Sequence, residues 1–168
     1  MLTEAGISVE VFAAGSSTDE LTLHSGIRVH RLEANNRDAF REGVMLLFKA
    51  RQLQKPFDLL ESPEIGAEGA HIAEALPELA VVAKLHTPTV LVGAIGYEPP
   101  TLSQQMRFRL GALRRGRWAG LPSSSYNRGA DPEWAFTRSA DEIAAPSQAI
   151  ADRLIADWDL APDRISVF

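Results

Sequence analysis

The sequence predicts an α/β fold, with a doubly wound, mainly parallel sheet that carries helices on both faces. Segments with strand-like and helix-like patterns alternate along the chain, which is typical of this class. Residues 79–85 form an almost continuous apolar run, and such a run predicts a central strand that is buried on both faces. The length of 168 residues, with 45% hydrophobic side chains, predicts a single domain over residues 1–168.

The first part of the chain predicts two strands and a long helix. Residues 7–13 and 26–32 alternate between apolar and polar side chains, as strands do. The helix over residues 36–54 begins at an asparagine, which is a favourable N-cap. Residues 2–6 have the pattern of a last helical turn that ends at Gly6. Since α/β domains normally begin with a strand, we expect a first strand to be missing here; a frayed N-terminal arm is the alternative.

The middle part predicts a short strand over residues 57–60 and then a helix that begins near Ser62, with a proline in its first position. Glu64, Glu68 and His71 fall at positions i, i+4 and i+7 on one face of that helix. The glutamates are explained either by a favourable interaction with the helix dipole or by a role as ligands. The spacing leaves both interpretations open.

The last part predicts a helix over residues 101–118, between loops over residues 89–100 and 120–131. Strands over residues 140–145 and 164–168 then flank a helix that is capped by a serine. The strand–helix–strand order again favours parallel pairing.

Charge is distributed unevenly along the chain. The net charge of −5 argues against non-specific binding of nucleic acid. Residues 99–130 nevertheless contain six arginines and no acidic residue. The arginines from Arg107 to Arg117 are interpreted either as a solvated helix face or as a contact for an anionic membrane surface or substrate.

Several kinds of site are excluded or disfavoured. The chain has no cysteine, which excludes disulfides and cysteine-based sites and suits a cytoplasmic location. It has no glycine-rich nucleotide loop, nucleophile elbow or zinc-protease motif, and its four histidines lack the spacing of metal ligands. We therefore expect neither a metal nor a tightly bound cofactor. We recognise no signal peptide, and no apolar run approaches the ~20 residues of a membrane-spanning helix.

His86 is the strongest single candidate for a functional residue. It follows the central apolar run, and ligands of open α/β sheets bind beyond the carboxyl ends of the strands. The alternative is a strand end whose histidine is only hydrogen-bonded within the protein.

Five short segments occur in an order that is informative as a whole. They are Glu-Ser-Pro-Glu at 61–64, followed by Gly66 and Glu68; Lys-Leu-His-Thr-Pro at 84–88; Ala-Asp-Glu-Ile at 140–143; Pro-Ser at 146–147; and Arg-Ile-Ser-Val-Phe at 164–168. Their order and spacing resemble the N-terminal half of a family 4 retaining glycosyltransferase of the two-domain GT-B type. The resemblance spans nearly the whole chain and implies a Rossmann-like domain.

The resemblance also implies a role for each motif. In that family the N-terminal domain chiefly binds the acceptor, which is a sugar or a lipid-type molecule, and a C-terminal domain binds the nucleotide-sugar. By resemblance, His86 is the catalytic-site residue and positions the transferred sugar. Lys84 and Thr87 would lie beside it, and Glu64 and Glu68 near the acceptor. A neutral imidazole can donate or accept a hydrogen bond without bringing charge into the cleft.

Two parts of the family pattern have no counterpart in this sequence: the first strand with its glycine-rich loop, and the donor-binding domain. We therefore expect a fragment or excised domain that is inactive alone, from a cytoplasmic enzyme that is peripheral to the inner face of the membrane. The alternatives are a non-catalytic Rossmann-like binding or scaffold module, and part of another nucleotide-sugar enzyme such as a 2-epimerase. A His86 that lines a cleft near carboxylates favours the transferase half, whereas a His86 packed among apolar side chains favours the scaffold.

Overall fold

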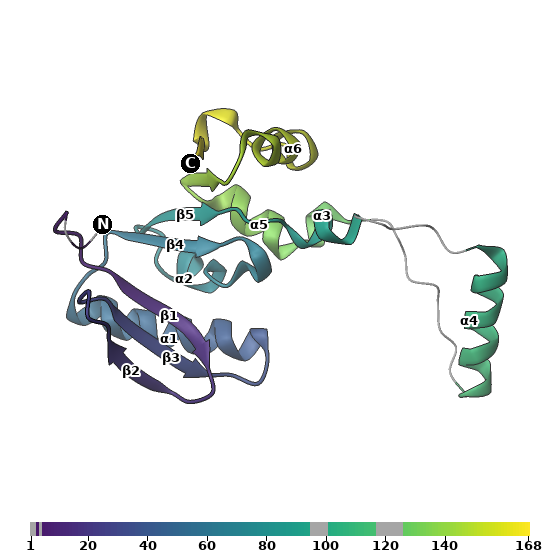
Figure 1. Ribbon diagram of the computed structural model, residues 1–168, viewed down its shortest axis with the longest axis horizontal. Helices are drawn as coiled ribbons and strands as arrows, with labels where there is room; N and C mark the ends of the chain where they lie inside the picture. Colours follow the sequence, from purple (N-terminus) through teal and green to yellow (C-terminus); the bar gives the residue numbers. More distant parts are fainter. Residues whose placement is uncertain (1–2, 4, 95–100, 117–125) are drawn as a thin grey trace.

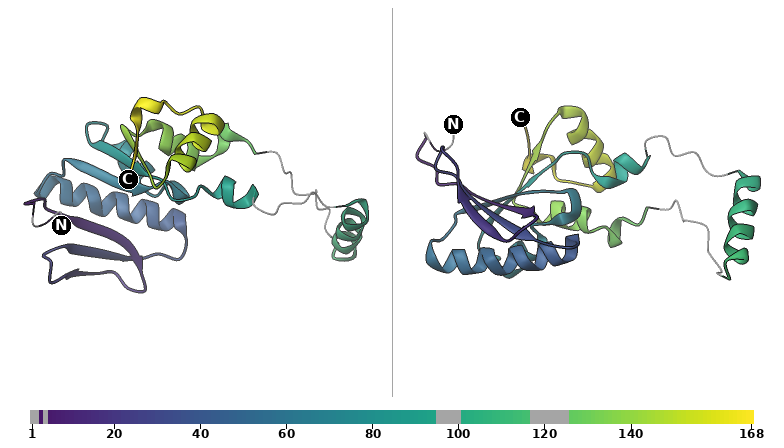
Figure 2. Two further views of the ribbon diagram at one scale, coloured as in Figure 1. Left: turned by 45° about the horizontal axis from the view of Figure 1, so that its top comes forward. Right: turned by 60° about the horizontal axis from the view of Figure 1, so that its bottom comes forward.

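The computed structural model describes residues 3, 5–94, 101–116 and 126–168 (Figure 1). Two sheets and the helices that pack on them form the body of the molecule, and α4 (Leu102–Arg114) stands apart from that body in every view (Figures 1 and 2). The expected N-terminal helix end over residues 2–6 falls partly on residues 2 and 4, which lie outside the described residues.

The first sheet has three strands in the order β1–β3–β2. As predicted, β1 (Glu10–Gly15) is parallel to β3 (Arg28–Glu33), and β2 (Asp19–Thr22) adds an antiparallel strand to it. Strand β2 lies between the two segments that the sequence predicts as strands, residues 7–13 and 26–32. A four-residue strand with a single apolar side chain is too short to show the alternation of a strand.

The second sheet has four strands, all parallel, and they follow one another in chain order. This arrangement confirms the α/β class and the Rossmann-like fold. The predicted central strand is β5, which pairs with β4 on one side and with β6 on the other. Its carboxyl end therefore lies between the ends of two neighbouring strands. The strands are β4 (Leu59–Pro63), β5 (Ala80–Lys84), β6 (Glu142–Ala145) and β7 (Ile165–Val167).

Side chains that accept a backbone N–H mark the starts of the longer helices. The Asn36 carbonyl accepts from the Ala39 N–H at 2.9 Å, and the Ser147 hydroxyl accepts from the Ile150 N–H at 3.3 Å, so both predicted N-caps are confirmed. The other helices are α1 (Arg37–Gln54), α2 (Ala70–Ala75), α3 (Thr89–Ala94), α5 (Pro132–Ser139) and α6 (Gln148–Trp158), with short 3₁₀ turns η1 (Ile65–Ala67), η2 (Arg128–Ala130) and η3 (Pro162–Arg164).

The prediction that a helix begins near Ser62 is wrong. Ser62 belongs to β4, and the chain passes through η1 before α2 begins. Gly66 lies in the left-handed region with φ of 74°, which breaks the helical path. A Cβ at Gly66 would lie 2.6 Å from the Arg37 side chain, so both the backbone conformation and the available space require glycine. Glu64 and Glu68 consequently do not share a helix face with the later His71.

Two further elements differ from the sequence pattern. The predicted loop over residues 89–100 begins with α3, and its remaining residues 95–100 lie outside the described part. The predicted basic helix is α4, whose last helical residue is Arg114; Arg117 and Trp118 lie outside the described residues.

One face of the second sheet is buried under helices. Ala83 of β5 pairs with Ile143 of β6, and both are 0% exposed. Ala83 packs in one core cluster with side chains of α1, α2 and α5, and Ile143 packs in another with α6. On the opposite face Val82 and Glu142 are half-exposed, which differs from the predicted covering of both faces. Because β4 to β7 follow in chain order, every right-handed crossover passes on the same side.

Candidate functional site

The carboxyl end of β5 presents His86 to solvent. The strand ends at Lys84, Leu85 is buried, and the His86 side chain is 53% exposed. The ring therefore lies at the carboxyl edge of an interior parallel strand, where ligands of such sheets bind.

A buried carboxylate holds His86 in place. Glu64, which is 0% exposed, accepts the backbone N–H of His86 at 2.8 Å, and its other oxygen lies 3.3 Å from Nδ1 of the imidazole. The Lys84 carbonyl oxygen lies 3.2 Å from the same nitrogen. Because both neighbours of Nδ1 are acceptors, Nδ1 donates and carries a proton. In the neutral ring with this tautomer, Nε2 is left to accept a hydrogen bond from a ligand.

A second buried carboxylate, Glu133 of α5, joins the loops on either side of His86. One oxygen accepts the Gly66 N–H at 2.9 Å and the Thr89 hydroxyl at 2.7 Å, and the other accepts the Thr89 N–H at 2.8 Å. Glu133 is 5% exposed, and these three donors offset the cost of burying its charge. Glu133 connects η1 with the first turn of α3, so the loops after β4 and β5 are both fixed to helix α5.

Sequence reasoning missed Glu133, although a local signal was present. Asp131 caps α5 by accepting the Glu133 N–H at 2.9 Å, and Pro132 follows it in the first helical position. Asp-Pro-Glu is a common helix start, so α5 was identifiable from sequence. The inward orientation of Glu133 was not, because Gly66 is 67 residues away in the chain.

The structure brings some of the other predicted site residues to His86 and directs others elsewhere. Thr87 is half-buried and follows His86 directly. The Lys84 ammonium lies 3.1 Å from a Glu61 carboxylate oxygen and 5.3 Å from the centre of the Phe168 ring, so this side chain extends toward the neighbouring strands. Glu68 is one-third exposed.

Glu68 lies near basic side chains at the loop after β4. One of its carboxylate oxygens is 3.9 Å from Nε of Arg37. The guanidinium of Arg41 donates to the Gly66 carbonyl, with Nε at 2.8 Å. Arg41 of α1 thus donates to the carbonyl of Gly66 while Glu133 of α5 accepts its N–H, so η1 is held by both helices.

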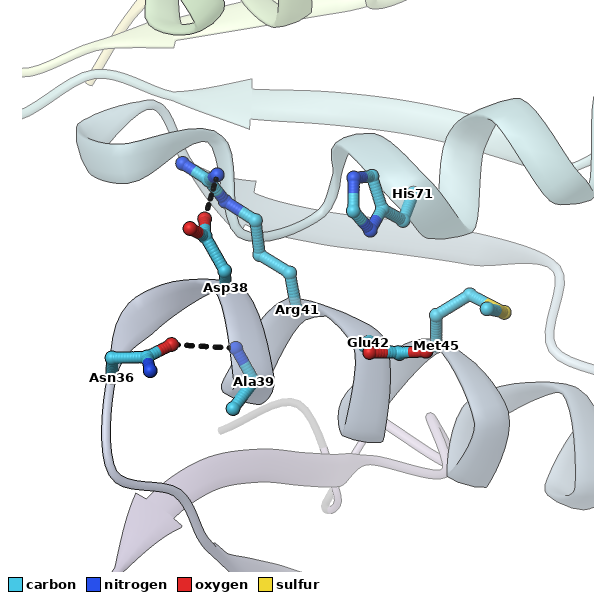
Figure 3. Close-up of a pocket in the computed structure, with 7 residues that line it drawn as sticks. All are labelled: Asn36, Asp38, Ala39, Arg41, Glu42, Met45 and His71. Carbon is cyan, nitrogen blue, oxygen red and sulfur yellow. Dashed lines mark hydrogen bonds and ion pairs between the residues drawn. The ribbon is translucent and has the colours of Figure 1, made fainter.

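Two surface cavities lie beside this region, and neither includes His86. The first, of about 550 Å³, lies over α1 and α2 (Figure 3); the second, of about 470 Å³, lies between α2 and α5. In the first, Asp38 is paired with Arg41 at 2.9 Å and Asn36 is used as the helix cap. Since these polar groups already serve α1, we place the candidate chemistry at His86 rather than in the first cavity.

The described ranges also limit the kinds of site that are present. They contain no group of three or more histidine, cysteine, aspartate or glutamate side chains placed to hold a metal ion. None of the helices in these ranges is long and apolar enough to cross a membrane.

Fold and site together define a Rossmann-like α/β domain with an exposed histidine, backed by a buried glutamate, at the carboxyl edge of its parallel sheet. The sequence matches Glycosyltransferase Family 4 over residues 1–168, and the chain belongs to that family. A comparison with curated proteins gave no match. Family membership supports a glycosyltransferase-type function, and it confirms that the sequence resembles family 4 glycosyltransferases.

Proposed function

We propose that this chain is the acceptor-binding half of a retaining, two-domain GT-B glycosyltransferase, which transfers a hexosyl group from a nucleotide-sugar to a sugar or lipid-type acceptor. The observation that carries the proposal is the pair formed by His86 and the buried Glu64 at the carboxyl edge of β5. Membership of Glycosyltransferase Family 4 supports the class of reaction.

In this proposal His86 positions the transferred sugar. Glu64 fixes the backbone and one ring nitrogen of His86, which leaves Nε2 to accept a hydrogen bond from a sugar hydroxyl. Such a contact orients the anomeric carbon between the departing diphosphate and the acceptor oxygen. Because Glu64 has no exposed surface, it acts as a positioning residue, while Glu68 and Thr87 remain the candidates for direct contact with substrate.

The nucleotide-sugar is bound by a second domain in this proposal, and that domain supplies the groups that stabilise the departing diphosphate. No metal takes part. The scaffold alternative is less well supported, because the His86 ring is exposed beside a carboxylate rather than packed among apolar side chains.

The function is tested in a fusion of this chain to the donor-binding domain of a characterised member of the family. Transfer from a panel of radiolabelled nucleotide-sugars is measured for the unchanged fusion and for its His86→Ala variant. We expect His86→Ala to lower kcat/KM about tenfold to a hundredfold, because one lost hydrogen bond in the transition state costs about 1.5–3 kcal/mol.

His71→Ala is the matched control, because His71 is an exposed histidine on α2 and lies in the cavity of Figure 3. It should leave transfer unchanged. Full activity of a folded His86→Ala variant would reject His86 as a site residue. The unfused chain should give no turnover, and clear turnover by it would overturn the division into two halves.

A further inference from the structure

Helix α4 exposes a stripe of large apolar side chains that the body of the protein does not cover. Leu102, Met106, Leu110 and Leu113 recur at helical spacing and lie on one side of the helix. They are 81%, 57%, 56% and 54% exposed, respectively. Figures 1 and 2 show α4 apart from both sheets in all three views.

Arginines border this stripe on both sides. At 100° per residue, Arg107 and Arg114 fall along one border of the stripe and Arg109 along the other. None of these three side chains has an ion-pair partner among the described residues, and residues 101–116 contain no acidic side chain. The helix therefore carries a cationic, arginine-bordered apolar stripe on a protein whose net charge is −5, with Phe108, which is 44% exposed, on the side opposite to the stripe.

We propose that α4 lies in the surface of a membrane that contains anionic lipids. An apolar stripe with arginines along both borders suits a helix parallel to the membrane plane, with aliphatic side chains below the headgroups and guanidinium groups among the lipid phosphates. Charge complementarity selects an anionic surface, because each guanidinium gains from a nearby negative lipid. A soluble polyanion would use the arginines but would leave four aliphatic side chains in water.

The local structure supports a preformed helix. Thr101 and Gln104 form a capping box, in which the Thr101 hydroxyl accepts the Gln104 N–H and the Gln104 side chain accepts the Thr101 N–H. At the other end, Nε of Arg115 donates to the Gly111 carbonyl at 3.0 Å. A helix that is ordered before binding loses less conformational entropy at the membrane.

The place of α4 in the chain links this membrane contact to the segments that carry the candidate site. It lies between α3 and α5, whose first turns are joined by the hydrogen bonds of Thr89 to Glu133 beside His86. On the proposed function, membrane binding would bring that site to acceptors in the membrane. Membrane binding itself does not depend on the proposed transfer reaction.

The test is co-sedimentation of the full chain with two kinds of vesicle, one of phosphatidylcholine alone and one in which part of it is replaced by phosphatidylglycerol. We expect binding to the phosphatidylglycerol vesicles, much weaker binding to phosphatidylcholine, and a loss of binding in high salt. Arg107→Gln and Arg109→Gln should each weaken partitioning about fivefold, and Leu110→Asp should weaken it by more.

Leu53→Asp is the matched control for the apolar change, because Leu53 is a 90% exposed leucine on α1. It should leave vesicle binding unchanged. Equal sedimentation with both vesicles, or binding that survives Leu110→Asp and both arginine changes, would overturn the proposal. Binding to heparin without binding to vesicles would also overturn it, because α4 would then recognise a soluble polyanion.

Discussion

At the scale of single residues, the candidate site depends on two buried carboxylates that offer a ligand almost no exposed surface. Glu64 and Glu133 each accept hydrogen bonds from the backbone of a neighbouring loop, and both contact the segment that follows β5. Their first effect is on conformation: they fix where His86 and Thr89 lie. A buried carboxylate is costly unless each oxygen has a donor, so removing either side chain should be felt in stability as well as in function.

Replacing Glu64 should separate these effects. Glu64→Ala leaves the His86 N–H without its acceptor, and we expect a loss of about 1–3 kcal/mol in the free energy of unfolding. Glu64→Gln keeps an acceptor for that N–H and should cost less, about 1 kcal/mol. Urea denaturation followed by far-UV circular dichroism measures both.

Glu61→Ala serves as the control for the Glu64 variants, because Glu61 is exposed and its ion pair with Lys84 should contribute about 0–1 kcal/mol. If Glu64→Ala were no more destabilising than Glu61→Ala, Glu64 would not hold the segment that carries His86.

At the scale of elements, an ionic cluster joins β1, β3 and α1. Glu10 of β1 is 5% exposed, and its two oxygens accept from Nη2 and Nε of Arg51 at 2.6 and 3.0 Å. Nε2 of His30 donates to it at 2.7 Å, and Arg28 lies 3.7 Å away. The Arg51 hydrogen bonds, with those of His30 and the charges of Arg51 and Arg28, outweigh burial and lower the pKa of Glu10 to about 2.

This cluster predicts acid sensitivity. The pKa of Glu10 is lower in the folded than in the unfolded protein, so its stabilisation is complete above the unfolded value of 4.5 and disappears as the pH falls toward 2. The contribution is at most about 3 kcal/mol. We expect Glu10→Gln to lower the unfolding free energy at pH 7 and to approach the unchanged protein near pH 2.

Urea denaturation at several pH values between 7 and 2 checks this expectation, with Glu42→Gln on the exposed side of α1 as the control. Parallel pH profiles for Glu10→Gln and the unchanged protein would show that the cluster is not responsible for the acid sensitivity.

The elements also show which parts of the structure sequence patterns can predict. The apolar run over residues 79–85 predicted β5 and the position of His86 at its carboxyl end. The capping residues predicted where α1 and α6 begin. Strand β2 has too few residues to show the alternation of a strand. The left-handed conformation of Gly66 interrupts the segment that was predicted to be a helix, so the chain forms η1 there. Contacts such as Thr89 with Glu133, 44 residues apart, leave no local pattern, so the support of His86 became visible only in three dimensions.

At the scale of the whole molecule, the parallel strands form two sheets rather than one. Leu32 of β3 and Leu60 of β4 belong to the same core cluster, so the sheets share hydrophobic packing without sharing a hydrogen-bonded ladder. Within the described residues, β1 pairs with β3 alone and β4 pairs with β5 alone. Each sheet therefore has an edge that is open to pairing.

Hydrogen exchange should reveal these two edges. Successive backbone N–H groups of a strand point to opposite sides, so alternate amides of β1 and β4 have no partner strand, whereas β5 is paired on both sides. We expect slow and fast amides to alternate along β1 and β4 in residue-resolved NMR exchange, and uniform protection in the interior of β5.

Dilution distinguishes an open edge from one that is covered by self-association. Exposed apolar side chains on these strands, Val11 at 40% and Leu59 at 52%, favour association at high concentration, because an open strand edge is a template for a further strand. The alternating pattern should therefore persist, and sharpen, as the protein is diluted. If all amides of β1 and β4 stayed as protected as those of β5 at low protein concentration, another segment would have to pair with them, and the two sheets would be one.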